Sequence, residues 1–223
     1  MILDDKQLLI TPKAPALFPH LVEPDNYEGS LDYKVSLILD PADTGVQELL
    51  DDITETAEAQ LALAVKELTA KGGKHKKLAG EMSLSLPFSE EYEEDGSETG
   101  RFILKAKSKA AGVTAKGKAW ERKVPLFDAG TSGKVKKIPH GTVPIFSGAV
   151  LKVELVTNVY TATGLKLAGV SFFIKAVQVI AVSEGNDSNG FGCEEGGFDA
   201  SDLEEQDIAP DFEDDVAGVD EDF

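Results

Sequence analysis

The chain has 223 residues, enough for one well-buried domain plus a terminal extension, and it carries a formal net charge of −18 at pH 7. That total argues at first sight against a nucleic-acid partner, because phosphate binding needs an excess of Lys and Arg. The single cysteine, Cys193, excludes an internal disulfide, and the lack of a run of about 18 apolar residues excludes a membrane span. We therefore expect an unexported protein of the cytoplasm with no membrane partner.

The first predicted strand covers residues 31–39, where apolar and polar side chains alternate. A period of two is typical of a strand that buries one face. One side carries Leu31, Tyr33, Val35, Leu37 and Leu39, and the other carries Asp32, Lys34, Ser36 and Ile38.

A long helix is predicted next. Thr44 and Gln47 have the spacing of a capping box at its start. Apolar residues then recur at steps of three and four from Val46 to Leu68, which places one apolar stripe along a helix that runs to about residue 70. Gly72-Gly73 is expected to end the helix.

The remaining predicted elements are strands. A basic loop at 74–77 leads to a strand at 82–88, and an acidic hairpin tip at 90–98 leads to a return strand at 101–109. The return strand has Phe102, Leu104 and Ala106 on one face and three lysines on the other. Further strands are predicted at 120–127, 149–159 and 167–182.

Five or six strands with one helix and no βαβ alternation predict a mainly β fold. We expect an OB-type five-stranded antiparallel barrel with one long inserted helix. The usual helix of such barrels follows the third strand, whereas this one comes earlier in the chain.

The charge is segregated along the sequence. Residues 184–223 contain 16 Asp and Glu and no Lys or Arg, so residues 1–183 carry only −2 of the total. Residues 101–175 contain 14 Lys and Arg against three acids. We predict a DNA-binding domain at 1–183 and a disordered acidic tail at 184–223, because the tail has too few apolar residues to offset its chain entropy.

The basic segment combines cations with a large aromatic surface, as a groove for single strands requires: cations neutralise phosphates, and aromatic faces stack on bases without reading sequence. An ordinary solvated strand face with a core tryptophan is the other interpretation. The predicted phosphate contacts are Lys34, Arg101, Lys105, Lys107, Lys109, Arg122, Lys136 and Lys137. Trp120, with Tyr33 or Tyr160, is predicted to stack on bases.

The chain ends in Asp220-Glu221-Asp222-Phe223, where acids lead into a C-terminal aromatic residue. A carboxylate beside a phenyl ring is a compact anchor for a basic pocket with an apolar floor on a partner protein. The tail could also occupy the chain's own basic groove and compete with DNA there. A purely solubilising role is the simpler interpretation of such a tail.

Catalytic and metal-binding signals are weak. His20, His75 and His140 lie far apart and beside no nucleophile motif, and no phosphate-binding glycine motif is present. Asp187 to Gly190 has only part of a calcium loop. We therefore expect no catalytic residues, no metal and no cofactor. A metal-dependent nuclease would need carboxylates on a rigid element, and none is predicted.

The order and spacing of several segments resemble the replication single-stranded-DNA-binding proteins of short-tailed, T-odd-type phages. The segments lie between residue 30 and the C-terminus: Tyr33-Lys34-Val35, Pro41, Lys76-Lys77, Pro87-Phe88, Phe102, Lys105, Val143-Pro144-Ile145, Gly148, Leu151-Lys152-Val153 and Phe223. The first 25 residues match no part of that family.

The resemblance implies an OB-fold with an early long helix and an acidic tail ending in Phe. It also implies a protein that coats single-stranded DNA during phage replication and recombination in the host cytoplasm. The expected partners are single-stranded DNA, the polymerase and helicase-primase bound through the tail, and a second copy in a homodimer. The rival hypothesis is an interaction protein whose acidic tail mimics nucleic acid to block a host factor.

Overall fold

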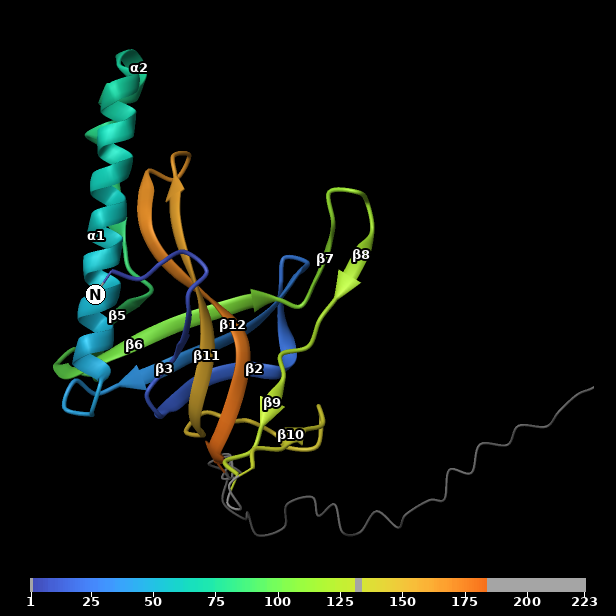
Figure 1. The fold of residues 1–223 in the computed structure, drawn as a ribbon. Coiled ribbons are helices and arrows are strands. Elements are labelled where there is room, and N and C mark those ends of the chain that lie inside the picture. Colours follow the sequence, from blue (N-terminus) through green and yellow to red (C-terminus); the bar gives the residue numbers. More distant parts are fainter. Residues whose placement is uncertain (1, 131–133, 184–223) are drawn as a thin grey trace, which may run out of the picture. The chain divides into compact units, whose positions relative to one another are not determined.

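The computed structural model describes residues 2–130 and 134–183, which form twelve strands and two helices. The protein is mainly β, as predicted (Figure 1). The predicted tail at 184–223, with Asp220, Glu221, Asp222 and Phe223, lies outside the described residues.

Ten strands form one sheet, in which eight follow the order β10-β9-β12-β11-β2-β3-β6-β5. β1 pairs with β11 and β4 pairs with β12, while β7 and β8 form a separate two-stranded hairpin. The first and last strands of this order, β10 and β5, do not pair with each other, so the sheet is not closed. This corrects the prediction of a five-stranded barrel. The bounds are β1 Leu8–Ile10, β2 Ala14–Tyr27, β3 Ser30–Leu39, β4 Ser83–Ser85, β5 Phe88–Tyr92, β6 Glu98–Lys109, β7 Ala111–Val113, β8 Ala119–Glu121, β9 Leu126–Phe127, β10 Lys137–Ile138, β11 Val150–Ala162 and β12 Leu167–Ala181.

Alternation identified the strands that build the core. In β3 the side chains of Tyr33, Val35, Leu37 and Leu39 are buried, and in β11 those of Leu151, Val153 and Leu155 are buried. β6 pairs with β3 in antiparallel register and buries Leu104 and Ala106, so its lysines point away from the core. The predictions for β3, β6, β11 and β12 are therefore confirmed.

The long helix α1 spans Val46–Lys71 and packs Val46, Leu50, Ile53 and Ala57 into the same core. Gly72 ends it, as predicted. The predicted capping box is wrong: the N-cap is Gly45, in the left-handed conformation at φ 80°, and no side chain caps the helix. Neither described helix is long and apolar enough to cross a lipid bilayer.

Several predicted boundaries are wrong. The predicted basic loop is the short helix α2, Gly73–Ala79, and the predicted strand at 82–88 is divided into β4 and β5. The predicted strand at 120–127 is likewise divided into β8 and β9. β2 was not predicted because Pro15, Pro19 and Pro24 interrupt its pattern, and irregularities in its pairing with β3 accommodate the chain there.

Gly169 allows β4 to lie directly beside β12. A Cβ at this position would overlap the carbonyl oxygen of Ser85 and lie 2.8 Å from the carbonyl carbon. Gly169→Ala is therefore expected to lower the free energy of unfolding by about 1–3 kcal/mol, the usual effect of overpacking. Gly164→Ala is the matched control, since a Cβ at Gly164 meets no atom within 4 Å. Urea unfolding measures both, and equal stability of the two variants would contradict this account of β4 packing.

Candidate nucleic-acid interface

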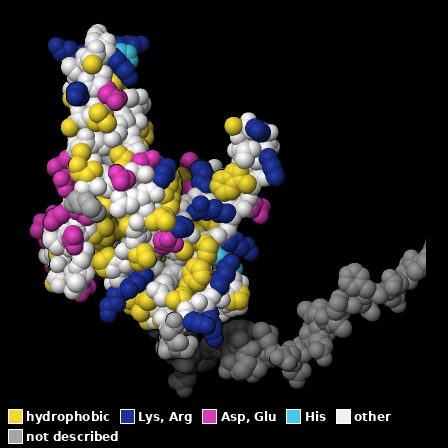
Figure 2. Space-filling view, viewed as in Figure 1, with side chains coloured by type: hydrophobic (Ala, Val, Ile, Leu, Met, Phe, Trp, Pro, Cys, Tyr) yellow, Lys and Arg dark blue, Asp and Glu magenta, His cyan; other side chains and the backbone are white. Residues whose placement is uncertain are grey.

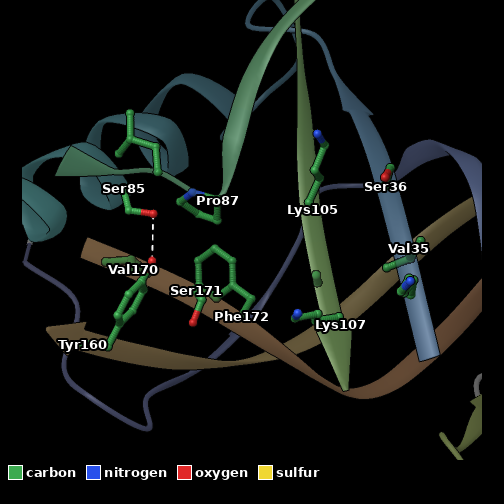
Figure 3. A pocket seen from close by; sticks show the side chains of 13 residues that line it. Val35, Ser36, Ser85, Pro87, Lys105, Lys107, Tyr160, Val170, Ser171 and Phe172 are labelled. Carbon is green, nitrogen blue, oxygen red and sulfur yellow. Dashed lines mark hydrogen bonds between the residues drawn. The ribbon is translucent and has the colours of Figure 1, made fainter. Parts of the chain in front are cut away.

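A groove lies where the two halves of the sheet face each other without pairing. On one side are β3 and β6, and on the other are β11, β12 and the link from β4 to β5 (Figure 3). Its volume is about 300 Å³. The Oγ of Ser108 on β6 donates a hydrogen bond to the carbonyl oxygen of Ile174 on β12 at 3.0 Å, which holds the two halves together beside the groove. The lining residues are Lys34, Val35, Ser36, Ser85, Leu86, Pro87, Lys105, Ala106, Lys107, Tyr160, Val170, Ser171 and Phe172.

Three predicted cations meet in this groove. Lys34 is directly opposite Lys107 in the β3–β6 register, and Ser36 is opposite Lys105. Like charges placed opposite each other destabilise a sheet, so this ladder has no evident structural benefit of its own. Lys105 and Lys107 are exposed, and Figure 3 shows Lys107 pointing into the groove.

Lys34 has a protein partner. Its Nζ donates to the carboxylate of Asp25 on β2, which raises the pKa of Lys34 and lowers that of Asp25. Asp25 thus offsets part of the repulsion between Lys34 and Lys107. Lys105 and Lys107 are the cations of the groove best placed to meet an external anion.

The opposite wall of the groove is apolar and aromatic. Tyr160 is half-buried, and its hydroxyl donates to the Oγ of Ser85 at 2.7 Å (Figure 3). This bond holds the ring at the groove wall. Phe172, which is buried, and Pro87 line the same groove. An aromatic ring held opposite exposed lysines is the arrangement that a single strand requires.

The electrostatic character of the groove differs from that of the rest of the domain. None of the thirteen lining residues is acidic. The acidic side chains of the β5–β6 turn, at 90–98, instead gather with the first half of α1, whereas basic side chains follow the central strands and the β7–β8 hairpin (Figure 2). The groove therefore favours an anionic ligand.

Trp120 lies outside the groove, on the β7–β8 hairpin, where it is half-exposed. It pairs with Gly112 across the hairpin, and it lines a second hollow together with Lys109. Lys109 is exposed at the end of β6, and its Nζ donates to the Oγ of Ser30 at 3.3 Å. Lys109 thus lies between the groove and Trp120 along the chain.

Two predicted arginines have structural partners. The Nη2 of Arg122 donates to the carbonyl oxygen of Ile174 at 2.7 Å, so Arg122 shares with Ser108 the acceptor that bridges the sheet halves. The Nε of Arg101 lies 2.6 Å from the carboxylate of Glu91, beside the acidic turn. Its charge is neutralised there, and the structure does not bring it to the groove.

Tyr33 must be corrected. It is 3% exposed and packs in the hydrophobic core, so its ring offers no free face to a base, and the prediction that it stacks is wrong. Lys136 and Lys137 are exposed at β10, which is an edge strand of the sheet. They lie apart from the residues that line the groove.

Several groove residues were not predicted as site residues. Ser85, Pro87, Ser171 and Phe172 come from segments far from Lys34 and Lys105 in sequence. Ser85 and Pro87 lie in the strand predicted at 82–88, and the proline is a detectable signal that this strand is interrupted. Phe172 lies in an apolar run that predicts burial and nothing more.

The described residues provide no group of three or more His, Cys, Asp or Glu side chains that could hold a metal ion. His140 instead has its Nε2 2.6 Å from the carbonyl oxygen of Val124, a contact that fixes the loop before β11.

No protein-family model matches the chain, and no curated protein matches its sequence. The crystal structure of gp2.5, a single-stranded-DNA-binding protein encoded by bacteriophage T7, matches with a TM-score of 0.65 and 21% identity, and the match covers 85% of this chain and 98% of that one. The single-stranded-DNA-binding protein from bacteriophage Enc34, in complex with single-stranded DNA, matches with a TM-score of 0.50 and 12% identity over 79% and 88% of the two chains. The chain therefore has the fold of phage single-stranded-DNA-binding proteins, as the resemblance in its sequence predicted.

Proposed function

We propose that the protein binds single-stranded DNA without sequence preference, with the strand lying in the groove between β6 and β12. Lys105 and Lys107 contact phosphates, and Tyr160 offers a face for stacking. The observation that carries the proposal is the placement of exposed lysines opposite a fixed aromatic ring in a groove that no carboxylate lines.

Sequence independence follows from the chemistry of the groove. Phosphate contacts position a strand but carry no sequence information, and every base has a face that can stack. Lys34 lines the same groove, and Lys109 extends the track at the end of β6. Lys136 and Lys137 are a further proposed contact at β10.

The biological role that we propose is the coating of exposed strands during phage DNA replication and recombination in the host cytoplasm. The fold shared with gp2.5 and with the Enc34 protein, whose structure includes single-stranded DNA, supports this role. Coating requires stoichiometric binding and no catalysis.

We further propose that the tail at 184–223 competes with DNA for the groove and recruits replication proteins. Its 16 acidic residues and lack of cations match the basic groove. Asp220, Glu221, Asp222 and Phe223 would anchor the polymerase or helicase-primase. Assembly as a homodimer is part of the same proposal.

A salt titration of oligo-dT binding tests the function. The logarithm of the binding constant should fall linearly with the logarithm of the salt concentration, with a slope of about −0.7 for each phosphate neutralised. With Lys105, Lys107 and Lys109 engaged, and Lys34 held by Asp25, we expect a slope near −2 or steeper. A flat response would exclude a phosphate track.

Asp25→Asn is expected to strengthen DNA binding, because it releases Lys34 for a phosphate. The salt slope should steepen by about 0.7. Since the pKa of Asp25 is lowered from 3.8, Asp25 stays ionised at neutral pH and holds Lys34 until the pH falls through that lowered pKa. The effect should therefore be the same from pH 6 to pH 8. An unchanged affinity for oligo-dT in Asp25→Asn would show that Lys34 contributes nothing to the track.

A further inference from the structure

We infer that the β7–β8 hairpin is a second subsite for the same strand, separate from the groove, in which a base stacks on Trp120 beside exposed lysines. This inference rests on the proposed function, because the groove must already hold the strand. It divides the binding site into two parts that require ligands of different length.

The pairing of the hairpin places Lys118 on the same face as Trp120. The N–H of Thr114 donates to the carbonyl oxygen of Lys118 at 2.9 Å, and the N–H of Arg122 donates to that of Ala110 at 2.8 Å, so the pairing extends beyond β7 and β8 in both directions. Residues two apart on a strand share a face. Lys118 and Trp120 therefore share one face, and Lys118 is exposed. Arg122 is on that face by alternation, but its guanidinium is held by a carbonyl oxygen of β12.

Gly112 provides the seat for the indole. A Cβ at Gly112 would lie 2.8 Å from Cζ2 of Trp120 and 3.0 Å from its Nε1, so the ring lies against bare backbone. One side of the ring is thus occupied by the hairpin, and the half-exposed residue presents the rest to solvent. Glycine at this position makes a flat aromatic platform possible.

The platform has no packing role in the main core. Trp120 is outside the hydrophobic core cluster of the described residues, and its hairpin forms a sheet of its own. An isolated two-stranded ribbon has little stability by itself, so the packing of Trp120 on Gly112 supports the hairpin, and the exposed remainder of the ring is available to a ligand. The basic side chains that Figure 2 shows over this hairpin favour an anionic ligand over an apolar protein surface.

The subsite continues the track of the groove. Lys107 lines the groove, Lys109 follows on the same face of β6, and Lys109 and Trp120 line one hollow, which Glu28 and Glu121 also line. From Lys107 to Gly112 the chain advances five residues, at most about 17 Å at ~3.3 Å per residue, because it turns between β6 and β7 (Figure 1). At ~3.4 Å per nucleotide this limit corresponds to about five stacked nucleotides or fewer. A strand too short to span it fills the groove alone.

Two oligo-dT ligands separate the subsites: one of about 4 nucleotides and one of about 16, the limits of OB-fold site sizes. The chain has one tryptophan, so its fluorescence reports on position 120 alone. The long oligomer should quench it and the short one should not. Trp120→Ala should weaken binding of the long oligomer by about 5- to 150-fold and change binding of the short one less than about twofold.

Two further variants test the geometry. Trp120→Phe should restore most of the long-oligomer affinity, and Gly112→Ala, which displaces the indole, should reduce that affinity while leaving the short oligomer unaffected. Circular dichroism verifies the fold of each variant. Equal losses for both oligomers, or no loss for either, would overturn the second subsite. Failure of the wild-type protein to bind the short oligomer would instead overturn the groove itself.

Discussion

Replacement of Lys105 and Lys107 together by alanine is expected to weaken binding to oligo-dT by at least about 100-fold. A hydrogen bond to a charged group contributes about 1.5–3 kcal/mol, and both side chains are exposed in the groove opposite Tyr160. The salt slope should also become shallower by about 1.4, because two phosphates lose their counter-charges. Fluorescence anisotropy of a labelled oligomer measures both quantities.

The matched control removes the same charge elsewhere. Lys76 and Lys77 are exposed on α2, which contributes no residue to the groove. Lys76→Ala with Lys77→Ala should leave both the affinity and the slope nearly unchanged. Equal losses in the two double variants would mean that the protein binds DNA through its charge in general, without a defined track.

Deletion of residues 184–223 is expected to tighten DNA binding by about tenfold at low salt. A tethered segment reaches an effective concentration of roughly 1 mM. If the tail binds the groove with a dissociation constant of about 10⁻⁴ M, at the weak end of non-specific phosphate binding, it would weaken DNA binding about tenfold. The gain should disappear at high salt, because the tail and the DNA are both held by the same screened charges.

A neutral tail distinguishes charge from length. A variant with all 16 tail carboxylates changed to amides keeps the chain length, and it should bind DNA as tightly as the deletion variant. A band-shift assay with single- and double-stranded probes compares the three proteins. Unchanged or weaker binding after deletion would refute competition by the tail.

The strands that build the core were predictable because each buries one face. β3, β6, β11 and β12 read as strands in the sequence for that reason. β2 was not predictable, because its prolines break the alternation of apolar and polar residues. Irregularities in its pairing with β3 accommodate those prolines, and they are visible only in the structure. α2 read as a loop because four polar residues between glycines and Leu78 carry no periodic signal.

The candidate site was predictable only in part. Lys105, Lys107 and Lys109 belong to one strand, so their common face follows from alternation. The opposing wall comes from β11, β12 and the β4–β5 link, and which segments face one another is a property of the tertiary fold. No local pattern places Tyr160 opposite Lys107.

The error at Tyr33 could have been avoided from the sequence. Tyr33 and Lys34 are neighbours on one strand, so they point to opposite faces. The alternation that placed Tyr33 with Val35 and Leu37 already predicted burial of its ring. Lys34 and Tyr33 could not both face the same strand of DNA.

The most direct test of the groove is photo-cross-linking with an oligo-dT of about 16 nucleotides that carries halogenated deoxyuridines, followed by mass spectrometry of the linked peptides. Cross-links should map to Tyr160 and to the segment of β6 that contains Lys105 and Lys107, and free oligo-dT should compete them away. Cross-links confined to α2 or to β10, with none at Tyr160 or β6, would contradict binding in the groove.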